Sequence, residues 1–222
     1  MVSLQLIRDT LVVSARDLDE AWYLSLKGVI DYGHEYKVTV GSHAGSSRKE
    51  LDSYALEVRM PGTLPLVPSV PLGVPPPSSM DYVERYLPYL LCGNKQENED
   101  YTYGQDIEIQ LPKFIEILKE GGDGTNQACM TIGDPHTSVW LESPQCLRVI
   151  DARIRYGALH FYVYFRSWDL WSGYPANLAG VQLLKEYVCL ELEVEDGKLF
   201  AYSKGLHLYD HHWDVANMVL RR

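Results

Sequence analysis

The sequence predicts an α+β fold in which a mixed β-sheet packs on a few helices. Two observations carry this prediction. Runs such as 147–155 and 159–165 have the residue types and alternation of strands. The stretch 174–189 instead has helical spacing. With 222 residues and 46% apolar composition, the chain is expected to form one domain over 1–222, with a core that needs neither disulfides nor metal.

The first 60 residues are predicted to form short strands and turns. Residues 36–40 alternate polar and apolar side chains, 41–47 form a loop, and 54–59 form another strand. The segment 61–77 is so rich in proline that neither a helix nor a central strand fits, because proline lacks the N–H donor. Its leucines and valines are too apolar for a solvated linker, so we expect an extended segment packed on the surface.

Two helices are expected in the middle of the chain. Residues 81–91 follow the possible capping serines Ser78 and Ser79 and precede Gly93. Residues 97–100 form an acidic loop. The second helix, 112–120, places its apolar side chains on one face and ends at a glycine pair.

The C-terminal half alternates strands with one long helix. The strands 147–155 and 159–165 are expected to pair as a hairpin across 156–158. The helix 174–189 carries Pro175 in its first turn and has an apolar face wide enough for burial. An Asp-Gly turn and a strand at 199–203 follow.

Composition excludes several classes of protein. A net charge of -10 argues against a protein that coats nucleic acid polymers, although one or two local arginines can still hold a small phosphate. No run of 18 apolar residues and no signal-peptide pattern occurs, so we expect a soluble cytoplasmic protein and no membrane partner. The cysteines are far apart with no CxxC pair, and the histidine-rich run 207–212 lacks a second ligand cluster, so no metal is expected.

Polar residues stand within otherwise apolar sequence in three places. They are Cys146, which precedes a predicted strand, residues 166–169, which follow a predicted strand, and residues 205–212. Together with neighbouring residues they resemble the thymidylate synthase family, most closely its short archaeal-type members. The resemblance is firm from about residue 101 to 213 and weak before, with 1–80 divergent. The family's Pro-x-Cys, Arg-Ser-x-Asp, Gly-x-Pro-x-Asn and His-x-Tyr motifs stand at 144–146, 166–169, 173–177 and 207–209.

The resemblance implies a thymidylate-synthase-like fold and reductive methylation of dUMP to dTMP. A methylene-tetrahydropterin, of the tetrahydrofolate or tetrahydromethanopterin type, would be the co-substrate that supplies carbon and hydride. Cys146 would add to C6 of uracil and so make C5 nucleophilic. A free thiol is mostly protonated at neutral pH, and Arg166 would help it to ionise while also contacting the phosphate. Tyr103 would help to remove the C5 proton.

The remaining roles that the resemblance implies concern binding. Ser167 belongs to the substrate site. Asn177 would read O4 and N3 of uracil, because an amide is both donor and acceptor. His207 and Tyr209 would hold the 3′-hydroxyl of the sugar, and Asp169 would face the pterin.

The sequence departs from the family pattern in four places, the first of which is that Gln145 and Leu147 replace the usual neighbours of the cysteine. Residues 125–128 lack the arginine pair that the family donates from the partner subunit, so phosphate binding must rely on Arg166, on a loop arginine such as Arg48, or on another cation. Glu84 is the best candidate for the catalytic glutamate, although its spacing to Gly93 is about two residues longer than the family pattern, and the alternative is a solvated helix carboxylate. The sequence ends at Arg222, so the tail that closes over the pterin in longer members is not expected.

The family also implies a homodimer packed sheet to sheet. Some of the charged residues of 147–155 are expected to pair across that dimer or to reach the partner's site; the four are Arg148, Asp151, Arg153 and Arg155. Two other functions stay open. One is a pyrimidine-nucleotide hydroxymethylase, although cytosine-specific members tend to carry Asp where this chain has Asn177. The other is a nucleotide-binding relative that does not turn over.

Overall fold

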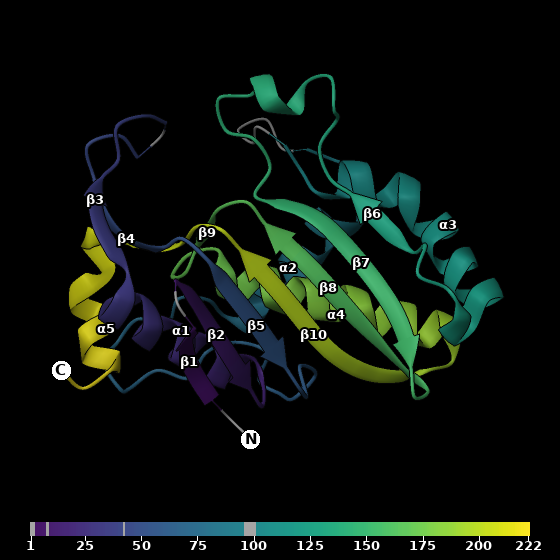
Figure 1. Ribbon diagram of the computed structural model, residues 1–222, viewed down its shortest axis with the longest axis horizontal. Coiled ribbons are helices and arrows are strands. Elements are labelled where there is room, and N and C mark those ends of the chain that lie inside the picture. The colour runs from purple at the N-terminus through teal and green to yellow at the C-terminus, as the bar shows by residue number, and fades with distance from the viewer. Residues whose placement is uncertain (1–2, 8, 42, 96–100) are drawn as a thin grey trace.

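The computed structural model describes residues 3–7, 9–41, 43–95 and 101–222, which fold as α+β with mixed sheets, as predicted (Figure 1). A seven-stranded sheet has the order β1-β2-β5-β10-β8-β7-β6, and a four-stranded sheet has the order β3-β4-β11-β9. The strands are β1 Ser3–Ile7, β2 Thr10–Ala15, β3 His34–Lys37, β4 Ser47–Leu51, β5 Tyr54–Val58, β6 Cys129–Thr131, β7 Leu147–Arg155, β8 Ala158–Phe165, β9 Trp168–Asp169, β10 Glu195–Ser203 and β11 Leu206–Tyr209. The α-helices are α1 Leu18–Tyr32, α2 Met80–Leu91, α3 Gly104–Gly121, α4 Tyr174–Leu192 and α5 Trp213–Val219.

The large sheet is built around the predicted hairpin. β7 and β8 pair antiparallel across Tyr156 and Gly157, both of which have positive φ. β10 then runs parallel to β8 and antiparallel to β5, which makes the sheet mixed. The turn expected at 196–197 is instead a register shift inside β10, where Gly197 lies so close to β8 that a Cβ would stand 2.5 Å from the Leu159 carbonyl oxygen.

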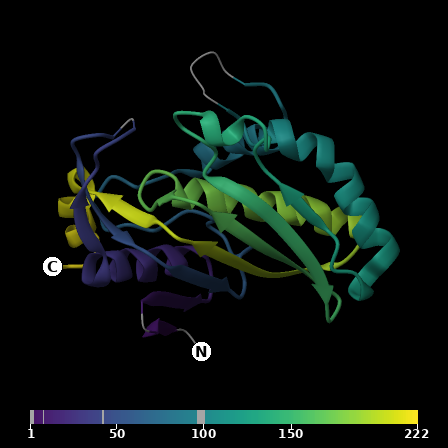
Figure 2. The same ribbon diagram turned by 45° about the horizontal axis from the view of Figure 1, so that its top comes forward.

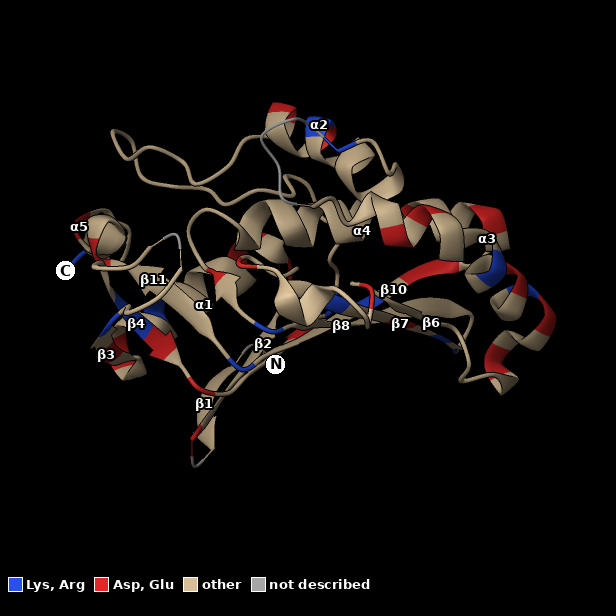
Figure 3. Ribbon diagram, turned by 90° about the horizontal axis from the view of Figure 1, so that it is seen from above, with Lys and Arg blue, Asp and Glu red and all other residues tan. Residues whose placement is uncertain are grey.

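Helices cover one face of this sheet (Figures 2 and 3). α4 confirms the predicted helix 174–189 and continues three residues further. It is buried along most of its length and packs on α2, α3 and the sheet. The sheet side chains that face it, such as Phe161 and Phe165, are fully buried. The core therefore lies between β8 and α4, and the strand ends beside it hold the motif residues.

The prediction for the first 60 residues was wrong at α1. This helix buries a stripe at helical spacing that includes Trp22, Leu26 and Val29. Asp17 caps it by accepting a hydrogen bond from the Glu20 backbone N–H. The carboxylate of Glu20 in turn accepts from the Arg16 N–H. A capping pattern and an apolar stripe were thus present in the sequence.

The proline-rich segment 61–77 contains neither helix nor strand, as predicted. Leu66 is buried, and the Ser69 N–H donates to the Asp19 carboxylate, which ties the segment to α1. Leu64 and Leu72 are exposed, so the segment packs on the surface through only part of its apolar side chains.

The two middle helices differ in how well the sequence predicts them. α2 confirms the helix 81–91, with Ser79 as its cap. α3 begins at Gly104, well before the predicted start at Pro112. The expected start was wrong because proline in the third turn removes only one helical hydrogen bond, and both Pro112 and Glu108, whose carbonyl it frees, are exposed to water. The acidic loop 97–100 lies outside the described residues.

The small sheet was largely missed. The predicted strand 36–40 appears two residues earlier as β3, and the polar run Ser47–Leu51 forms β4 beside it and beside β11. β4 has no apolar alternation, and pairing with β3 and β11 is what makes it a strand. Among the described residues, no helix combines the length and apolar character needed to cross a membrane.

Candidate active site

Seven of the ten predicted site residues line one cavity of about 830 Å³. They are Arg48, Cys146, Arg166, Ser167, Asp169, His207 and Tyr209. The pairing of the strands explains why they meet. Cys146 precedes β7, Arg166 follows its hairpin partner β8, and β11 lies between β4 and β9 in the small sheet. The cavity therefore stands where the two sheets adjoin.

Cys146 is partly exposed in this cavity and lies beside a fixed cation. The Nη2 atom of Arg166 is 3.9 Å from Sγ. The same guanidinium donates to the carbonyl oxygens of Pro144 and Gln145, the latter at 3.1 Å from Nε. These bonds hold the positive charge of Arg166 against the loop that carries the sulfur.

Two phenols stand behind Cys146. The backbone N–H of Cys146 donates to the Tyr101 hydroxyl at 3.3 Å, and that of Leu147 donates to the Tyr103 hydroxyl at 3.4 Å. Burial, with the neighbouring Cys146 adding to it, raises the pKa of Tyr101 to about 12, and burial also raises the pKa of Tyr103. Both are neutral phenols at pH 7. The sequence predicted Tyr103 here but missed Tyr101, two residues earlier in the same Tyr-x-Tyr.

His207 is a neutral hydrogen-bonding group. It is 4% exposed, and Nδ1 lies 2.9 Å from the Gly205 carbonyl oxygen, an acceptor. The proton therefore sits on Nδ1, which leaves Nε2 as an acceptor. Burial lowers the pKa of His207 to about 4. The ring of His207 meets the ring of Tyr209 edge to face. The ring of His43 stacks on that of Tyr209, with 4.3 Å between the ring centroids.

This pKa shift predicts a loss of stability in acid. The unfolded chain takes up the His207 proton near pH 6.5 and the folded protein only near pH 4, so the free energy of unfolding falls as the pH drops through that window. The shift corresponds to about 3 kcal/mol below pH 4. Denaturant unfolding between pH 7 and 4 should show that His207→Asn loses less of its free energy of unfolding than the wild type does. The exposed His211→Asn should behave as the wild type, and equal pH slopes for all three proteins would refute the assignment.

Arg48 reaches the cavity from β4, but it is already partly engaged. Its Nε donates to the Tyr36 hydroxyl at 2.6 Å, and Nη2 lies 2.8 Å from the Glu50 carboxylate. Burial raises the pKa of Glu50, while the charge of Arg48 opposes that shift. A guanidinium has five N–H donors, so Arg48 keeps donors for an anion in the cavity.

Asp169 and Ser167 complete this cavity. One carboxylate oxygen of Asp169 accepts from the backbone N–H groups of Trp171 and Ser172, at 2.9 and 3.2 Å. These two bonds fix the carboxylate at the end of β9. Residues Asn126 and Gln127, where the sequence lacks an arginine pair, are exposed beside β6 and do not line this cavity.

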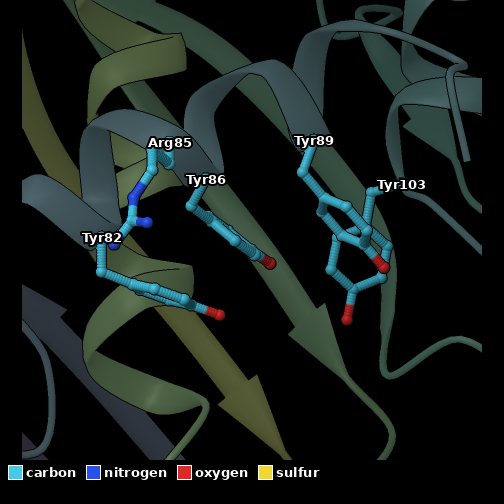
Figure 4. A pocket seen from close by; sticks show the side chains of 5 residues that line it. All are labelled: Tyr82, Arg85, Tyr86, Tyr89 and Tyr103. Atoms are coloured by element: carbon cyan, nitrogen blue, oxygen red, sulfur yellow. The ribbon is translucent and has the colours of Figure 1, made fainter. Parts of the chain in front are cut away.

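A second cavity, of about 380 Å³, is lined by tyrosines (Figure 4). Tyr82, Tyr86 and Tyr89 come from one face of α2, with Arg85 beside the first two, and Tyr103 closes the row. The rings of Tyr82 and Tyr86 stack, as do those of Tyr86 and Tyr89. Since Tyr103 also touches the Cys146 loop, the two cavities are neighbours. The spacing of the tyrosines along the helix was a signal that the sequence prediction did not use.

Asn177 lines neither cavity but contacts a tyrosine of the second one. It is 9% exposed in the first turn of α4, and its amide contacts Trp168 of β9 and Tyr86 of the second cavity. Glu84 is not brought to either cavity, since it is exposed on α2 and lines neither of them. The helix turns Tyr86, not Glu84, towards Asn177.

Comparison with known proteins gives one matching family and several similar proteins. The thymidylate synthase family model matches residues 99–222. A protein of Methanosarcina mazei named "Putative thymidylate synthase" is 29% identical over 95% of this chain and 94% of its own length. Proteins of the same name are 28% identical in Methanosarcina acetivorans, with the same coverage, and 23% identical in Methanothermobacter marburgensis, over 94% of this chain and 97% of the relative.

Proposed function

The chain belongs to the thymidylate synthase family, and we propose that it methylates dUMP at C5 to give dTMP through a covalent adduct on Cys146. The observation that supports this most is the position of the Cys146 sulfur, 3.9 Å from the Arg166 guanidinium and open to a cavity lined by the other motif residues. A thiolate there can add to C6 of uracil and leave the electron pair at C5.

The other predicted site residues have roles in binding the nucleotide and in proton removal in this proposal. Arg166 and Arg48 hold the phosphate, since they are the arginines that line the cavity in the described part of the chain. His207 accepts the hydrogen of the 3′-hydroxyl through Nε2, and Tyr209 donates to the same oxygen. Asn177 reads the base. The Tyr103 phenol, held beside the Cys146 loop, is neutral and so is not itself the base; its hydroxyl would hydrogen-bond the water molecule that takes the C5 proton.

The co-substrate fits the tyrosine-lined cavity. A methylene-tetrahydropterin supplies the carbon and the hydride when it is bound. The flat faces of Tyr86 and Tyr89 suit stacking of a flat ring, and Arg85 gives an anionic tail a partner. Asp169, at the rim of the neighbouring cavity, can accept hydrogen bonds from ring N–H groups. These residues do not distinguish a folate from a methanopterin.

A test that needs no pterin isolates the covalent step. The protein is incubated with 5-bromo-dUMP and excess thiol. Once an enzyme thiolate has added to C6, the added thiol reduces the carbon–bromine bond and bromide leaves. Release of bromide and formation of dUMP are expected. Binding of dUMP without any dehalogenation would point instead to a nucleotide-binding protein that does not turn over.

We also propose that the open face of the large sheet forms a homodimer with a second copy of this chain. This face carries the stacked pairs Tyr162–Phe200 and Tyr164–Tyr202, and no helix of the described chain covers it (Figure 3). Arg153 lies on the same face, and its Nε is buried without a partner among the described residues. Such an atom is costly unless another molecule satisfies it.

The dimer is tested by sedimentation at micromolar concentration, where the wild type should run as a dimer. Tyr162→Asp should shift it to a monomer, because a carboxylate would be buried without a partner. Tyr23→Asp, at a similarly exposed tyrosine on α1, should stay dimeric. A monomeric wild type would contradict the proposal.

A further inference from the structure

The side-chain amide of Asn177 is anchored at both ends. Trp168 donates from Nε1 to Oδ1 at 3.0 Å, and Nδ2 of the amide donates to the Tyr86 hydroxyl at 2.6 Å. An amide has two lone pairs on oxygen and two N–H donors. Within the described part of the chain these two bonds use one of each, so one lone pair and one N–H remain for a ligand.

Trp168 determines which end of the amide is oxygen. An indole N–H donates and cannot accept, so the atom that faces it must be Oδ1. Trp168 is 1% exposed and stacks on Phe165 at 4.0 Å, with the ring of Tyr174 at 4.3 Å. The indole therefore has no room to turn its N–H elsewhere. The orientation of the amide follows from chemistry and not from how its atoms were assigned.

A fixed amide distinguishes uracil from cytosine. Uracil offers an acceptor at O4 and a donor at N3, which match an N–H and a lone pair in that order. Cytosine offers a donor and an acceptor at the same two positions, so the amide would have to flip. The flipped amide would point its NH₂ group at the indole N–H of Trp168, and two donors would face each other in a buried site.

We infer that Trp168 is the positioning residue that sets the preference of this site for uracil over cytosine, by holding the amide of Asn177 in one orientation. The inference rests on the proposed function, because it takes Asn177 as the group that reads the base. Trp168 stands inside the Arg-Ser-x-Asp motif at the variable position, and it contacts Asn177 while lining neither of the two cavities.

The test compares Trp168→Phe with a matched control. The dissociation constants of dUMP and dCMP are measured for each protein without co-substrate. The wild type should prefer dUMP by about tenfold or more, a difference typical of one mispaired buried group. Trp168→Phe should bring the ratio of the dCMP and dUMP dissociation constants close to one, chiefly because dCMP binds more tightly. Trp22→Phe makes the same change at a tryptophan that is also 1% exposed and donates at 3.0 Å to the Leu170 carbonyl, and it should keep the wild-type ratio.

A second replacement keeps the test decisive if Trp168→Phe does not fold. Benzothienylalanine at position 168 retains two fused rings and has sulfur in place of the N–H, so packing stays while the donor is lost. It should lower the ratio as Trp168→Phe does. A folded variant of either kind with the wild-type ratio would overturn the inference while leaving the proposed function standing. A wild type that binds neither nucleotide would overturn both.

Discussion

Cys146→Ser is expected to abolish turnover while leaving the fold and nucleotide binding in place. The hydroxyl of serine fits the space of the thiol, but a neutral hydroxyl is a far weaker nucleophile than a thiolate. The loss of a nucleophile in other enzymes lowers kcat by roughly 10⁴–10⁶-fold, and a similar fall is expected here. Turnover, dUMP binding and thermal unfolding are measured on the same preparation.

The other three cysteines are the controls for this variant. Cys92 and Cys129 do not line the Cys146 cavity. Cys189 is buried, and burial raises its pKa to about 11, so it is not a nucleophile at neutral pH. Serine at each of these positions should retain most of the activity. If Cys146→Ser keeps more than a small fraction of wild-type turnover, the covalent mechanism is wrong for this protein.

Asn177→Asp is expected to weaken or invert the preference for dUMP over dCMP. A carboxylate keeps both anchoring contacts, because Trp168 still donates to one oxygen and the Tyr86 hydroxyl can turn to donate to the other. The fold should therefore survive. A carboxylate repels O4 of uracil but accepts from the amino group of cytosine, and when protonated it donates to N3 of cytosine.

The change is measured by titrating both nucleotides against both proteins. One mispaired buried group costs about 1–3 kcal/mol, so the ratio of the two dissociation constants should move by roughly tenfold or more. Equal affinity of the wild type for dUMP and dCMP would instead favour the hydroxymethylase or a permissive binding protein.

The elements that the sequence predicted well are those with local signals. The β7–β8 hairpin has alternation on both sides of a turn that contains Gly157, and α4 has an opening proline and an apolar face. α1 was missed because polar residues stand between the apolar residues of its buried stripe. Asp17 and Glu20 nevertheless mark the start of this helix. β4 is polar apart from Leu51 and becomes a strand by pairing with β3 and with β11, and β11 is more than 150 residues away, which no local pattern records.

In the candidate site, too, the residues that sequence motifs mark were predicted, whereas the contacts made by tertiary packing were not. The motif residues that the family resemblance supplied come together in one cavity, apart from Tyr103, Asn177 and Glu84. Tyr103 and Asn177 lie beside it, whereas Glu84 points to water. The contacts of Trp168 and Tyr86 with Asn177 depend on how β9, α2 and α4 pack, and sequence spacing carries no information on that packing.

The mass of the product tests the central claim most directly. The protein is incubated with dUMP and the methylene form of tetrahydrofolate, and in a second reaction with dUMP and the methylene form of tetrahydromethanopterin. The mass of the nucleotide is then measured by mass spectrometry. We expect a product heavier than dUMP by one CH₂ group with at least one donor, and none from Cys146→Ser. A product heavier by one CH₂O group would show that water and not hydride completes the reaction, and unchanged dUMP with both donors would contradict the account.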